Sequence, residues 1–536
     1  MTTTARRIAQ ALAARGVRHA FGMPGGETLP LLQALDEEGI RFILIRHEGS
    51  AGFAAAAAAQ LSGAPGVCVS TLGPGATNLT TPLAGALLDR DAVVAVTGEG
   101  PRGLRNVYTH QVLDQTALLR HAVKHAVTLT AEEAWREVPL ALRHLNAGRP
   151  GPVLLALPQD VSVAEQPRRF VDHFEPAPTS PAPEAVAAAA ATIRAARRPW
   201  VLVGLGGMSE AVAAPLRVVV EALGAPTLTT YKAKGALPSS HPLSVGAFGL
   251  SSTADAVWQR ALAEADLILA VGLDPVELRP QWLPGWDASI PVVTVDQAPP
   301  LDLVHPLSHC LVGDVPRALE ALAAALTPDA PPPWPTETVA RWRQAHDALF
   351  EEDGDSLGPA AAVRAMQAGL PQDCIVTLDV GAHRITAAQL WRCEAPNRLL
   401  QSNGLCSMGY GLPAAIAAKL TRPEATVAAL IGDGGLWMTL GELGTAAELG
   451  LDLVIVYFSD QSLALIEEKQ RRMRLPRLGV SFQNPEVTSL ARAFGAEGRR
   501  VTEAGALTAE VAAAVARGGL SLIEAVIDPR HYARQV

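Results

Sequence analysis

The chain is organised around one stretch, Leu430-Ile431-Gly432-Asp433-Gly434-Gly435. The apolar run 425–431 predicts a buried parallel strand, whose end delivers an acidic residue flanked by glycines into a turn. A second apolar run, 453–458, predicts the next strand and ends at Ser459-Asp460-Gln461-Ser462. Because successive parallel strands end at the same edge of a sheet, we expect Asp433 and Asp460 to lie side by side. Their oxygen atoms suit a divalent cation that also binds a diphosphate.

The same motif has a simpler interpretation. Gly-Asp-Gly after a strand is also a plain turn in many α/β proteins, so the motif alone does not establish a cofactor site. The segment between the two strands, 436–450, has the apolar spacing of a helix and completes a strand-helix-strand unit. Further motifs elsewhere in the chain have to decide between the two interpretations.

Composition and charge exclude several classes of protein. The 536 residues include 44 Lys and Arg against 53 Asp and Glu, and the net charge of -9 gives no basic surface for nucleic acid. No run approaches about 18 apolar residues outside Ala and Gly stretches, and no signal peptide is recognised, so we expect no membrane association. The five cysteines are scattered without metal-ligand spacing, which favours a reducing, cytoplasmic setting.

Two segments, 175–183 and 327–335, are too rich in proline for a helix or a central strand and predict linkers. They separate three parts of the chain, which we predict to be domains at 1–170, 186–327 and 340–536. Each part alternates apolar strands with helical segments, the pattern of parallel sheets covered on both faces. The sequence therefore predicts an α/β protein with three doubly wound parallel-sheet domains.

Glycine-rich turns follow predicted strands in the first two domains. In the first domain they are Gly22–Glu27 and Leu72–Asn78, the second of which opens a helix. Glu48 lies between a strand and an Ala-rich helix, where it is either favoured by the helix dipole or functional. In the middle domain, the turn 204–207 lacks the full glycine spacing of a dinucleotide site, and we expect it to serve packing.

The last domain adds two more stretches of this kind, Asp379-Val380-Gly381-Ala382-His383 and the loop 402–415. Together the motifs resemble those of the thiamin diphosphate enzyme superfamily of acetolactate synthases, pyruvate oxidases and 2-oxo acid decarboxylases, and most resemble acetolactate synthase large subunits. The matching motifs occur in the order of the family and are Phe-Gly-x-Pro-Gly-Gly at 21–26, His-Glu at 47–48, Gly-Pro-Gly-Ala-Thr-Asn at 73–78, Asp-Val-Gly-x-His at 379–383, Met-Gly-x-Gly-Leu-Pro-Ala-Ala at 408–415 and Gly-Asp-Gly at 432–434.

The resemblance implies a pyrimidine-binding domain at the N-terminus, a central domain, and a diphosphate-binding domain at the C-terminus. It also implies active sites formed between two subunits, and hence a homodimer or a homotetramer. The cofactors would be thiamin diphosphate and Mg²⁺. By their match to the family motifs, the cofactor-binding residues would be Gly25, Gly26, Gly75, Asn78, Gly381, Ala382, His383, Cys406, Met408, Gly434 and Gly435.

Three residues would support the chemistry of the cofactor. Glu48 matches the acid that hydrogen-bonds the aminopyrimidine, so that the cofactor can deprotonate its own thiazolium carbon. Met408 matches the residue that holds the cofactor bent, although a methionine there could also be ordinary core. The backbone carbonyl of Cys406 would accept a hydrogen bond from the pyrimidine amine.

The metal ligands implied by the same match are Asp433, Asp460 and the carbonyl of Ser462. Most members of the family have Asn where this chain has Asp460. The difference adds one negative charge beside the diphosphate, and we expect binding of Mg²⁺ to survive it.

The positions expected near the substrate depart from those of acetolactate synthases. Gln111 fits a cofactor-facing position, whereas His110 replaces Phe and either donates a proton or faces the subunit contact. Gly26 replaces the Asp used for protonation in pyruvate decarboxylases, which disfavours release of acetaldehyde. Lys469 replaces a Trp and either leaves room for a larger or anionic substrate or belongs to a solvated charged helix. The stretch 271–279 lacks the FAD-associated Arg-Phe-Asp-Asp-Arg pattern, so FAD is doubtful.

Three functions remain open. The leading hypothesis is a 2-oxo acid decarboxylating carboligase, similar to acetolactate synthase, that forms a C–C bond from an enamine intermediate and a carbonyl acceptor. The first alternative is a non-oxidative decarboxylase that releases an aldehyde from a larger or charged 2-oxo acid, with His110 as proton donor. The second is a non-catalytic relative, against which Glu48 argues. Small 2-oxo acids or aldehydes are the expected substrates.

Overall fold

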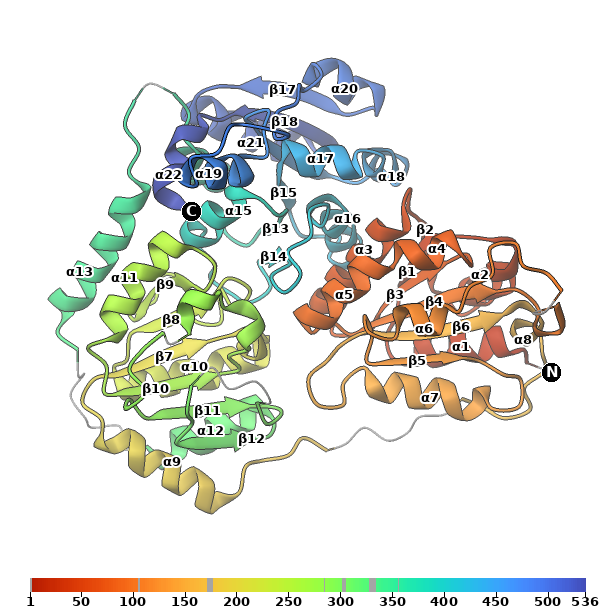
Figure 1. Ribbon diagram of the computed structural model, residues 1–536, viewed down its shortest axis with the longest axis horizontal. Helices are drawn as coiled ribbons and strands as arrows, with labels where there is room; N and C mark the ends of the chain where they lie inside the picture. The colour runs from red at the N-terminus through yellow and green to blue at the C-terminus, as the bar shows by residue number, and fades with distance from the viewer. Residues whose placement is uncertain are drawn as a thin grey trace. The chain divides into compact units, whose positions relative to one another are not determined.

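The computed structural model describes residues 2–104, 107–170, 177–283, 285–300, 305–326, 334–354 and 356–536. Their strands form three six-stranded parallel sheets (Figure 1), which confirms the predicted α/β fold. The predicted linkers at 175–183 and 327–335, and with them residue 327 at the predicted end of the central domain, lie partly or wholly outside the described residues. Helix α9 begins at Pro183, the last residue of the first predicted linker, and helix α13 begins at Thr336, directly after the second.

Contacts along the chain divide it into two compact units that are not consecutive in sequence. The first unit comprises Met1–Pro176, Gly404–Val427 and Gly435–Leu453. The second comprises Ala177–Asn403, Ala428–Gly434 and Val454–Val536. Residues of the predicted C-terminal domain therefore contribute to both units.

The first sheet belongs to the first unit and has the strand order β2-β1-β3-β4-β6-β5. Helices α1, α2 and α7 bury their apolar stripes against one face, where Leu12, Leu35 and Leu142 meet alternate strand residues such as Val67 and Val94. The elements of this region are α1 Thr4–Ala14, β1 His19–Met23, α2 Leu29–Glu37, β2 Arg41–Leu44, α3 Glu48–Ser62, β3 Gly66–Ser70, α4 Pro74–Asn78, α5 Thr80–Asp89, β4 Val93–Glu99, α6 Gln115–Leu119, β5 His125–Thr128, α7 Ala134–His144, β6 Val153–Pro158 and α8 Gln159–Ser162.

Helix α3 is buried on several sides because small alanine side chains dominate its sequence. Gly66 of β3 comes so near that a Cβ atom at this position would lie 1.9 Å from the carbonyl oxygen of Ala55. Helix α16, Gly411–Thr421, is part of the same unit and also packs against α3, with the rings of Phe53 and Tyr410 5.9 Å apart. This packing fixes the start of α3, where Glu48 lies.

The central sheet has the order β12-β11-β10-β7-β8-β9 and is covered on both faces. Helices α9, α10 and α12 contribute to the core on one face, and α11 and α13 to the core on the other, where Trp200, Trp258 and Trp342 gather. The elements are α9 Pro183–Ala195, β7 Pro199–Val203, α10 Glu210–Leu223, β8 Thr227–Thr230, β9 Ser244–Phe248, α11 Ser252–Leu262, β10 Leu267–Val271, β11 Val292–Asp296, β12 His309–Val312, α12 Val315–Ala325 and α13 Thr336–Asp347.

The third sheet, β14-β13-β15-β16-β18-β17, repeats the strand order of the first sheet. Helices α14 and α21 pack against it in one core cluster with Leu430, Val456 and Ile523. The remaining elements are α14 Pro359–Gly369, β13 Ile375–Leu378, α15 Ala382–Leu390, β14 Leu399–Gln401, β15 Val427–Gly432, α17 Asp433–Thr439, α18 Glu442–Glu448, β16 Leu453–Ser459, α19 Ala464–Arg472, α20 Val487–Ala493, β17 Glu497–Val501, α21 Ala504–Arg517, β18 Leu520–Val526 and α22 Tyr532–Gln535.

The prediction of a single helix over 436–450 is wrong, because two helices, α17 and α18, occupy this segment. The helical conformation is interrupted near Gly441, because glycine is a poor helix former. The carboxylate of the next residue, Glu442, accepts hydrogen bonds from the backbone N–H of Arg46. Helix α17 also begins earlier than expected, at Asp433. Asp433 and Gly434 therefore lie in the first helical turn and not in a separate turn.

The strand order of each sheet reverses between two neighbouring strands, which are β1 and β3, β7 and β10, and β13 and β15. Ligands of open parallel sheets bind outside the carboxyl ends of the strands at such a reversal. The motifs at 21–26 and 73–78 follow β1 and β3, and the motifs at 379–383 and 432–434 follow β13 and β15. The fold thus brings the sequence motifs together in two pairs.

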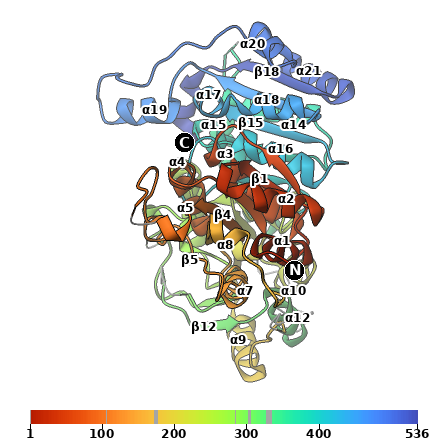
Figure 2. The same cartoon turned by 90° about the vertical axis from the view of Figure 1, so that its right-hand side faces the viewer.

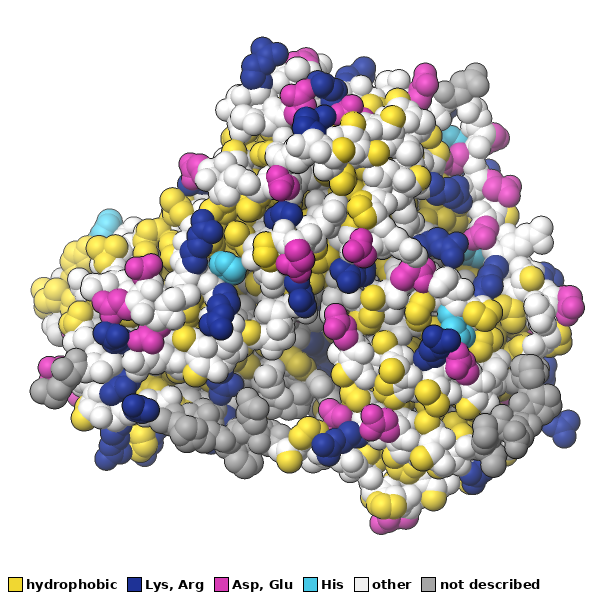
Figure 3. Space-filling view, turned by 180° about the vertical axis from the view of Figure 1, so that it is seen from behind, with side chains coloured by type: hydrophobic (Ala, Val, Ile, Leu, Met, Phe, Trp, Pro, Cys, Tyr) yellow, Lys and Arg dark blue, Asp and Glu magenta, His cyan; other side chains and the backbone are white. Residues whose placement is uncertain are grey.

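The surface of the described residues mixes charges. On the face drawn in Figure 3, Lys and Arg side chains lie among Asp and Glu side chains, as the net charge of -9 would suggest. Figure 2 shows the connection from α19 to α20 looping away from the third sheet. Across the described ranges, every helix is too short or too polar to span a membrane.

We expect the substitution Gly66→Ala to lower the free energy of unfolding by about 1–3 kcal/mol, because β3 and α3 would have to move apart. Urea unfolding followed by far-ultraviolet circular dichroism measures this change. Gly505→Ala is the matched control, since a Cβ atom on Gly505 has no neighbour within 4 Å, and it should cause no loss. Equal unfolding midpoints for the two variants would contradict the packing described for α3.

Candidate functional site

The first half of the candidate site surrounds Glu48, the first residue of α3. The side chain of His47 caps this helix by accepting a hydrogen bond from the N–H of Gly49 at 3.0 Å. The Glu48 side chain is buried, with 6% of the residue exposed, and its Oε2 accepts a hydrogen bond from Asn78 Nδ2 at 2.9 Å. A Cβ atom on Gly75 would lie 3.3 Å from Glu48 Oε1. The structure therefore brings Glu48, Gly75 and Asn78 together, as the sequence motifs suggested.

The glycines after β1 are held by a carboxylate that sequence analysis left unassigned. Glu27 Oε1 accepts hydrogen bonds from Thr71 Oγ1 at 2.6 Å and from the N–H of Leu72 at 2.9 Å, and thereby joins the loops after β1 and β3. A Cβ atom on Gly25 would collide with Thr71 Oγ1 at 2.2 Å, whereas Gly26 has no neighbour within 4 Å of such an atom. Gly25 is thus needed for close packing, and Gly26 faces open space.

Gln111 lies against the same group of loops. Its backbone has φ +59°, in the left-handed region, and a Cβ atom on Gly73 would lie 2.9 Å from Gln111 Cβ. His110 is exposed, with its ring 6.1 Å from the ring of Tyr108. Gln111 therefore packs next to the loop that holds Gly75, and His110 points to solvent in the isolated chain.

The loop that contains Cys406 and Met408 belongs to the same unit as Glu48. The N–H of Gly404 donates a hydrogen bond to Asp89 Oδ1 at 2.7 Å, which ties the loop to the end of α5. Cys406 has φ +55° and Gly409 has φ +93°, so the backbone turns sharply on both sides of Met408. The Met408 side chain is half-buried, as a side chain would be that supports a ligand.

The second half of the candidate site lies in the second unit, at the carboxyl ends of β13 and β15. Helix α15 begins at Ala382, and the next residue, His383, is buried between two glycines. Cβ atoms on Gly381 and Gly432 would lie 2.7 Å and 3.0 Å from the imidazole ring. Burial lowers the pKa of His383 to about 3, and among the described residues its Nε2 has no hydrogen-bond partner.

Asp433 and Asp460 follow adjacent strands, as predicted. Asp433 is 2% exposed, and its carboxylate accepts hydrogen bonds from the N–H groups of Gly434 and Gln461, both at 2.8 Å. Asp460 Oδ1 accepts a hydrogen bond from the N–H of Ser462 at 3.0 Å. Gln461, between the two, has φ +54°, so the chain turns tightly from Asp460 to Ser462.

Burial makes both carboxylates costly to ionise, and the charge of Asp433 adds to this cost for Asp460. Burial raises the pKa of Asp433, and burial together with the neighbouring Asp433 raises the pKa of Asp460 to about 7. Within the described part of the chain, neither carboxylate forms an ion pair with Lys, Arg or His. Oxygen ligands in this arrangement fit a hard divalent cation, which would offset the repulsion.

Asn484 is a site residue that sequence analysis missed. Its Nδ2 donates hydrogen bonds to Asp433 Oδ2 at 3.0 Å and to Ser459 Oγ at 2.8 Å, while Ser459 Oγ donates to Glu524 Oε1 at 2.8 Å. Asn484 therefore orients the Asp433 carboxylate from a distant part of the sequence. The only local signal is the Asn-Pro pair at 484–485, which indicates a turn and nothing about a metal.

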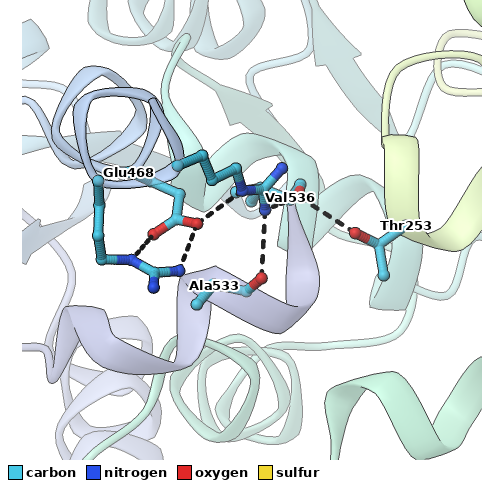
Figure 4. A network of polar contacts seen from close by, with 6 residues as sticks. Thr253, Glu468, Ala533 and Val536 are labelled. Atoms are coloured by element: carbon cyan, nitrogen blue, oxygen red, sulfur yellow. Dashed lines mark hydrogen bonds and ion pairs between the residues drawn. The ribbon is translucent and has the colours of Figure 1, made fainter. Parts of the chain in front are cut away.

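Helix α19 begins at Ala464, two residues after Ser462, and its Lys469 is exposed, as expected of a solvated charged helix. Figure 4 shows how the helix is held: Glu468 forms ion pairs with Arg471 and Arg472. Arg472 in turn donates hydrogen bonds to the carbonyls of Ala533 and Val536, which anchor α19 to α22.

In the central sheet the strand order reverses between β7 and β10, and residues of the loops after these strands fill the space at this point. The N–H of Gly206 donates to the carbonyl of Gly272 at 2.8 Å, and a Cβ atom on Gly272 would lie 2.4 Å from the carbonyl carbon of Gly206. Glu277 Oε2 accepts a hydrogen bond from the N–H of Leu205 at 2.7 Å, and burial raises the pKa of Glu277 to about 7. These contacts confirm the packing role expected for the turn 204–207.

Comparison with known proteins identifies the family of this chain. Models of the thiamine pyrophosphate enzymes match residues 2–118 with the N-terminal TPP binding domain, residues 186–322 with the central domain, and residues 379–525 with the C-terminal TPP binding domain. The acetolactate synthase isozyme 2 large subunit of Escherichia coli is 33% identical over 530 residues, which cover 98% of this chain and 95% of that protein. The chain belongs to the thiamine pyrophosphate enzyme family.

Other members of the family are similar to this chain to the same degree. The probable acetolactate synthase large subunit of Methanocaldococcus jannaschii is 31% identical, over 98% of this chain and 92% of that protein. The probable 2-ketoarginine decarboxylase of Pseudomonas aeruginosa is 33% identical, over 97% of this chain and 93% of that protein. The chain is thus a thiamin diphosphate-dependent enzyme, and relatives of equal similarity are named for different reactions.

We expect Gly432→Ala to weaken binding of thiamin diphosphate about tenfold. The new methyl group would push the His383 ring, which Gly381 blocks on the other side, and the loss of one hydrogen bond costs about 1 kcal/mol. Isothermal titration calorimetry with the cofactor measures the effect, and Gly505→Ala serves as the neutral control. Unchanged affinity in Gly432→Ala would show that His383 does not contact the cofactor.

Proposed function

We propose that this enzyme is a thiamin diphosphate- and Mg²⁺-dependent carboligase that decarboxylates a 2-oxo acid and joins the remaining fragment to a carbonyl acceptor, as acetolactate synthases do. The observation that carries the proposal is the buried Glu48 carboxylate at the start of α3, held by Asn78. A relative that had lost catalysis would not need an acid in this place. Relatives named as acetolactate synthases, similar over nearly the whole chain, support the same reaction class.

When bound, thiamin diphosphate would supply a nucleophilic thiazolium carbon and an electron sink for the pair left behind when the substrate carboxylate departs as CO₂. The role we assign to Glu48 is a hydrogen bond to the pyrimidine ring nitrogen, which sets the tautomer of the aminopyrimidine. Met408 supports the cofactor with its half-buried side chain, and the carbonyl of Cys406 accepts from the pyrimidine amine. Gly26 leaves room for the ring, and Gly25 and Gly75 let the loops that would hold it pack closely.

The opposite end of the cofactor is assigned to residues of the second half of the site. Asp433, Asp460 and the carbonyl of Ser462 would hold Mg²⁺, and the lack of an ionic partner for either carboxylate among the described residues supports this role. The unpartnered Nε2 of His383 supports a contact with the diphosphate. The remaining diphosphate contacts would be backbone N–H groups of Gly381, Ala382, Gly434 and Gly435.

A second candidate is a non-oxidative decarboxylase that releases an aldehyde from a larger or charged 2-oxo acid. Lys469 favours it, because this exposed lysine stands where acetolactate synthases carry Trp, and a lysine leaves room for a larger or anionic substrate. The similarity to a protein named as a probable 2-ketoarginine decarboxylase agrees with this candidate. In this reaction His110 would donate the proton that completes the aldehyde.

We propose that the chain self-associates as a dimer or tetramer in the cytoplasm. Val107 is 81% exposed, and five more large apolar side chains between residues 104 and 118, the stretch that contains Gln111, are also exposed. These exposed residues are Leu104, Val107, Tyr108, Val112, Leu113 and Leu118. An apolar patch of this kind is typical of a protein contact and lies where an active site shared between subunits would need one. The five free cysteines fit a reducing compartment.

The two candidate reactions differ in their products. With thiamin diphosphate and Mg²⁺ present, we expect CO₂ release from a panel of 2-oxo acids, and a carboligase will convert a second 2-oxo acid or an aldehyde into a hydroxy-ketone product. Release of free aldehyde alone would instead establish the decarboxylase.

Glu48→Gln should lower the rate of CO₂ release roughly 10²–10⁴-fold while the protein still binds the cofactor. Glu37→Gln, at an exposed carboxylate of the same unit, should have no effect, and no CO₂ from any substrate would refute both candidates.

The acidic partner Asp460 permits a separate test of the metal site. Asp460→Asn should retain Mg²⁺ because the amide oxygen remains a ligand, whereas Asp460→Ala should raise the Mg²⁺ requirement roughly 10–100-fold. Mg²⁺ titration of thermal stabilisation by thiamin diphosphate measures this independently of activity. Asp36→Ala, at an exposed carboxylate, is the control. Equal Mg²⁺ curves for Asp460→Ala and wild type would exclude Asp460 as a ligand.

A further inference from the structure

A large cleft lies within the second unit, apart from the residues assigned to the cofactor. Its volume is about 860 Å³, in the range of small-molecule binding sites. The connection between β8 and β9, helices α13 and α14, and the end of α15 line it. Among the described residues that line it, none is a candidate metal ligand or diphosphate contact.

Basic side chains dominate the charge of this cleft. Two acidic side chains, Asp347 and Glu394, also line it. The basic lining residues are Lys234, Arg343, Arg364, Arg392 and Arg398. In a chain with a net charge of -9, this is a local excess of positive charge. Such an excess in a concave site raises the local concentration of anions.

The direct contacts of the two acids are with groups other than the five basic side chains. Asp347 Oδ1 is 3.1 Å from His346 Nδ1, and Glu394 Oε2 accepts hydrogen bonds from the N–H and Oγ of Ser240. Over the described ranges, none of the five basic side chains lies within ion-pair distance of a carboxylate.

Three of the arginines instead bind backbone carbonyls. Arg343 donates to the carbonyls of Pro242 and Ser244, Arg364 to the carbonyl of Phe350 at 3.0 Å, and Arg398 to the carbonyl of Asp373 at 2.9 Å. These contacts hold the guanidinium groups in place, and the nearby Asp347 carboxylate offsets part of the charge of Arg343 and Arg364. Arg392 is exposed, and its side chain makes no hydrogen bond to a described residue.

Lys234 is the most unusual of these groups because it is buried without a counter-charge. Only 7% of the residue is exposed, and burial lowers the pKa of its ammonium group to about 8. Its Nζ donates one long hydrogen bond, 3.5 Å, to the carbonyl of Gln389. A buried cation without a charged partner is costly, so its presence in a cleft wall calls for an anion.

The backbone around Lys234 is fixed and cannot withdraw the side chain easily. Gly235 has φ +87°, and a Cβ atom there would lie 2.0 Å from the carbonyl oxygen of Ala395. Ser239 and Cys393 exchange two hydrogen bonds, both at 2.9 Å, which hold the same loop a few residues further on. The lysine is therefore presented to the cleft by a loop that is secured on both sides.

We propose that this cleft binds a small polyanion, a metabolite with two or more carboxylate or phosphate groups, with Lys234 as the central contact and Arg392 at the open edge. The proposal is independent of the reaction catalysed at the cofactor. The ligand would neutralise the charge of Lys234 and accept hydrogen bonds from the guanidinium group of Arg392. Carboxylates and phosphates share this chemistry, and the experiment below separates them.

Calorimetric titration of the enzyme loaded with thiamin diphosphate and Mg²⁺ tests the proposal, since the diphosphate site is then filled. The probes are inorganic phosphate, fructose 1,6-bisphosphate and tricarballylate. We expect saturable binding of at least one of them, and the one that binds identifies phosphate or carboxylate as the preferred group.

Lys234→Met preserves the length of the side chain and removes its charge, and should weaken binding at least tenfold. Arg392→Gln should also weaken binding of the probe. Lys419→Met is the matched control, because Lys419 Nζ also donates to a backbone carbonyl, that of Ala425, and does not line the cleft. Urea unfolding verifies that each variant is folded, and Arg392→Gln, at an exposed residue, keeps the test valid should Lys234→Met unfold. Absence of saturable binding of all three probes, or equal binding by the variants and wild type, would overturn the proposal.

Discussion

Close packing of loops at the carboxyl ends of neighbouring parallel strands is the constraint on which both halves of the candidate site depend. Gly25 and Gly75 permit it in the first sheet, and Gly381 and Gly432 permit it in the third. A larger residue at these positions would separate loops that hold Glu48 on one side and His383 on the other. In the central sheet the point of strand-order reversal is filled by contacts between Gly206 and Gly272, so a reversal alone does not create a site.

Buried charge is distributed in two complementary ways in this molecule. Asp433 and Asp460 concentrate negative charge at the ends of β15 and β16, where N–H groups hold the carboxylates in place. Lys234 concentrates positive charge in a cleft of the same unit, where its one hydrogen bond to a described residue is with the carbonyl oxygen of Gln389. Ionised groups are costly to bury, so both places are best understood as sites completed by a charge of opposite sign.

The parts of the fold that depend on short-range pattern could be predicted from the sequence. The strand predicted over 453–458 is observed as Leu453–Ser459, and the placement of Asp433 beside Asp460 followed from the ends of successive strands. The interruption between helices α17 and α18 could not be foreseen, because it involves a hydrogen bond from Arg46, almost four hundred positions away, to Glu442. Glu27, Asn484 and Lys234 escaped prediction for the same reason: their partners are remote in sequence, and no local motif marks them.

Helix α3 and its neighbour α16 have a consequence for the order in which the molecule is completed. Both belong to the first compact unit, but the ribosome makes α16, Gly411–Thr421, long after α3, Glu48–Ser62. Until then, the alanine-rich surface of α3 that α16 covers is exposed on the nascent chain. The N-terminal sheet can assemble early, but the unit that contains Glu48 reaches its final form only when nearly the whole polypeptide has been synthesised, which makes contacts of long sequence separation a late step in folding.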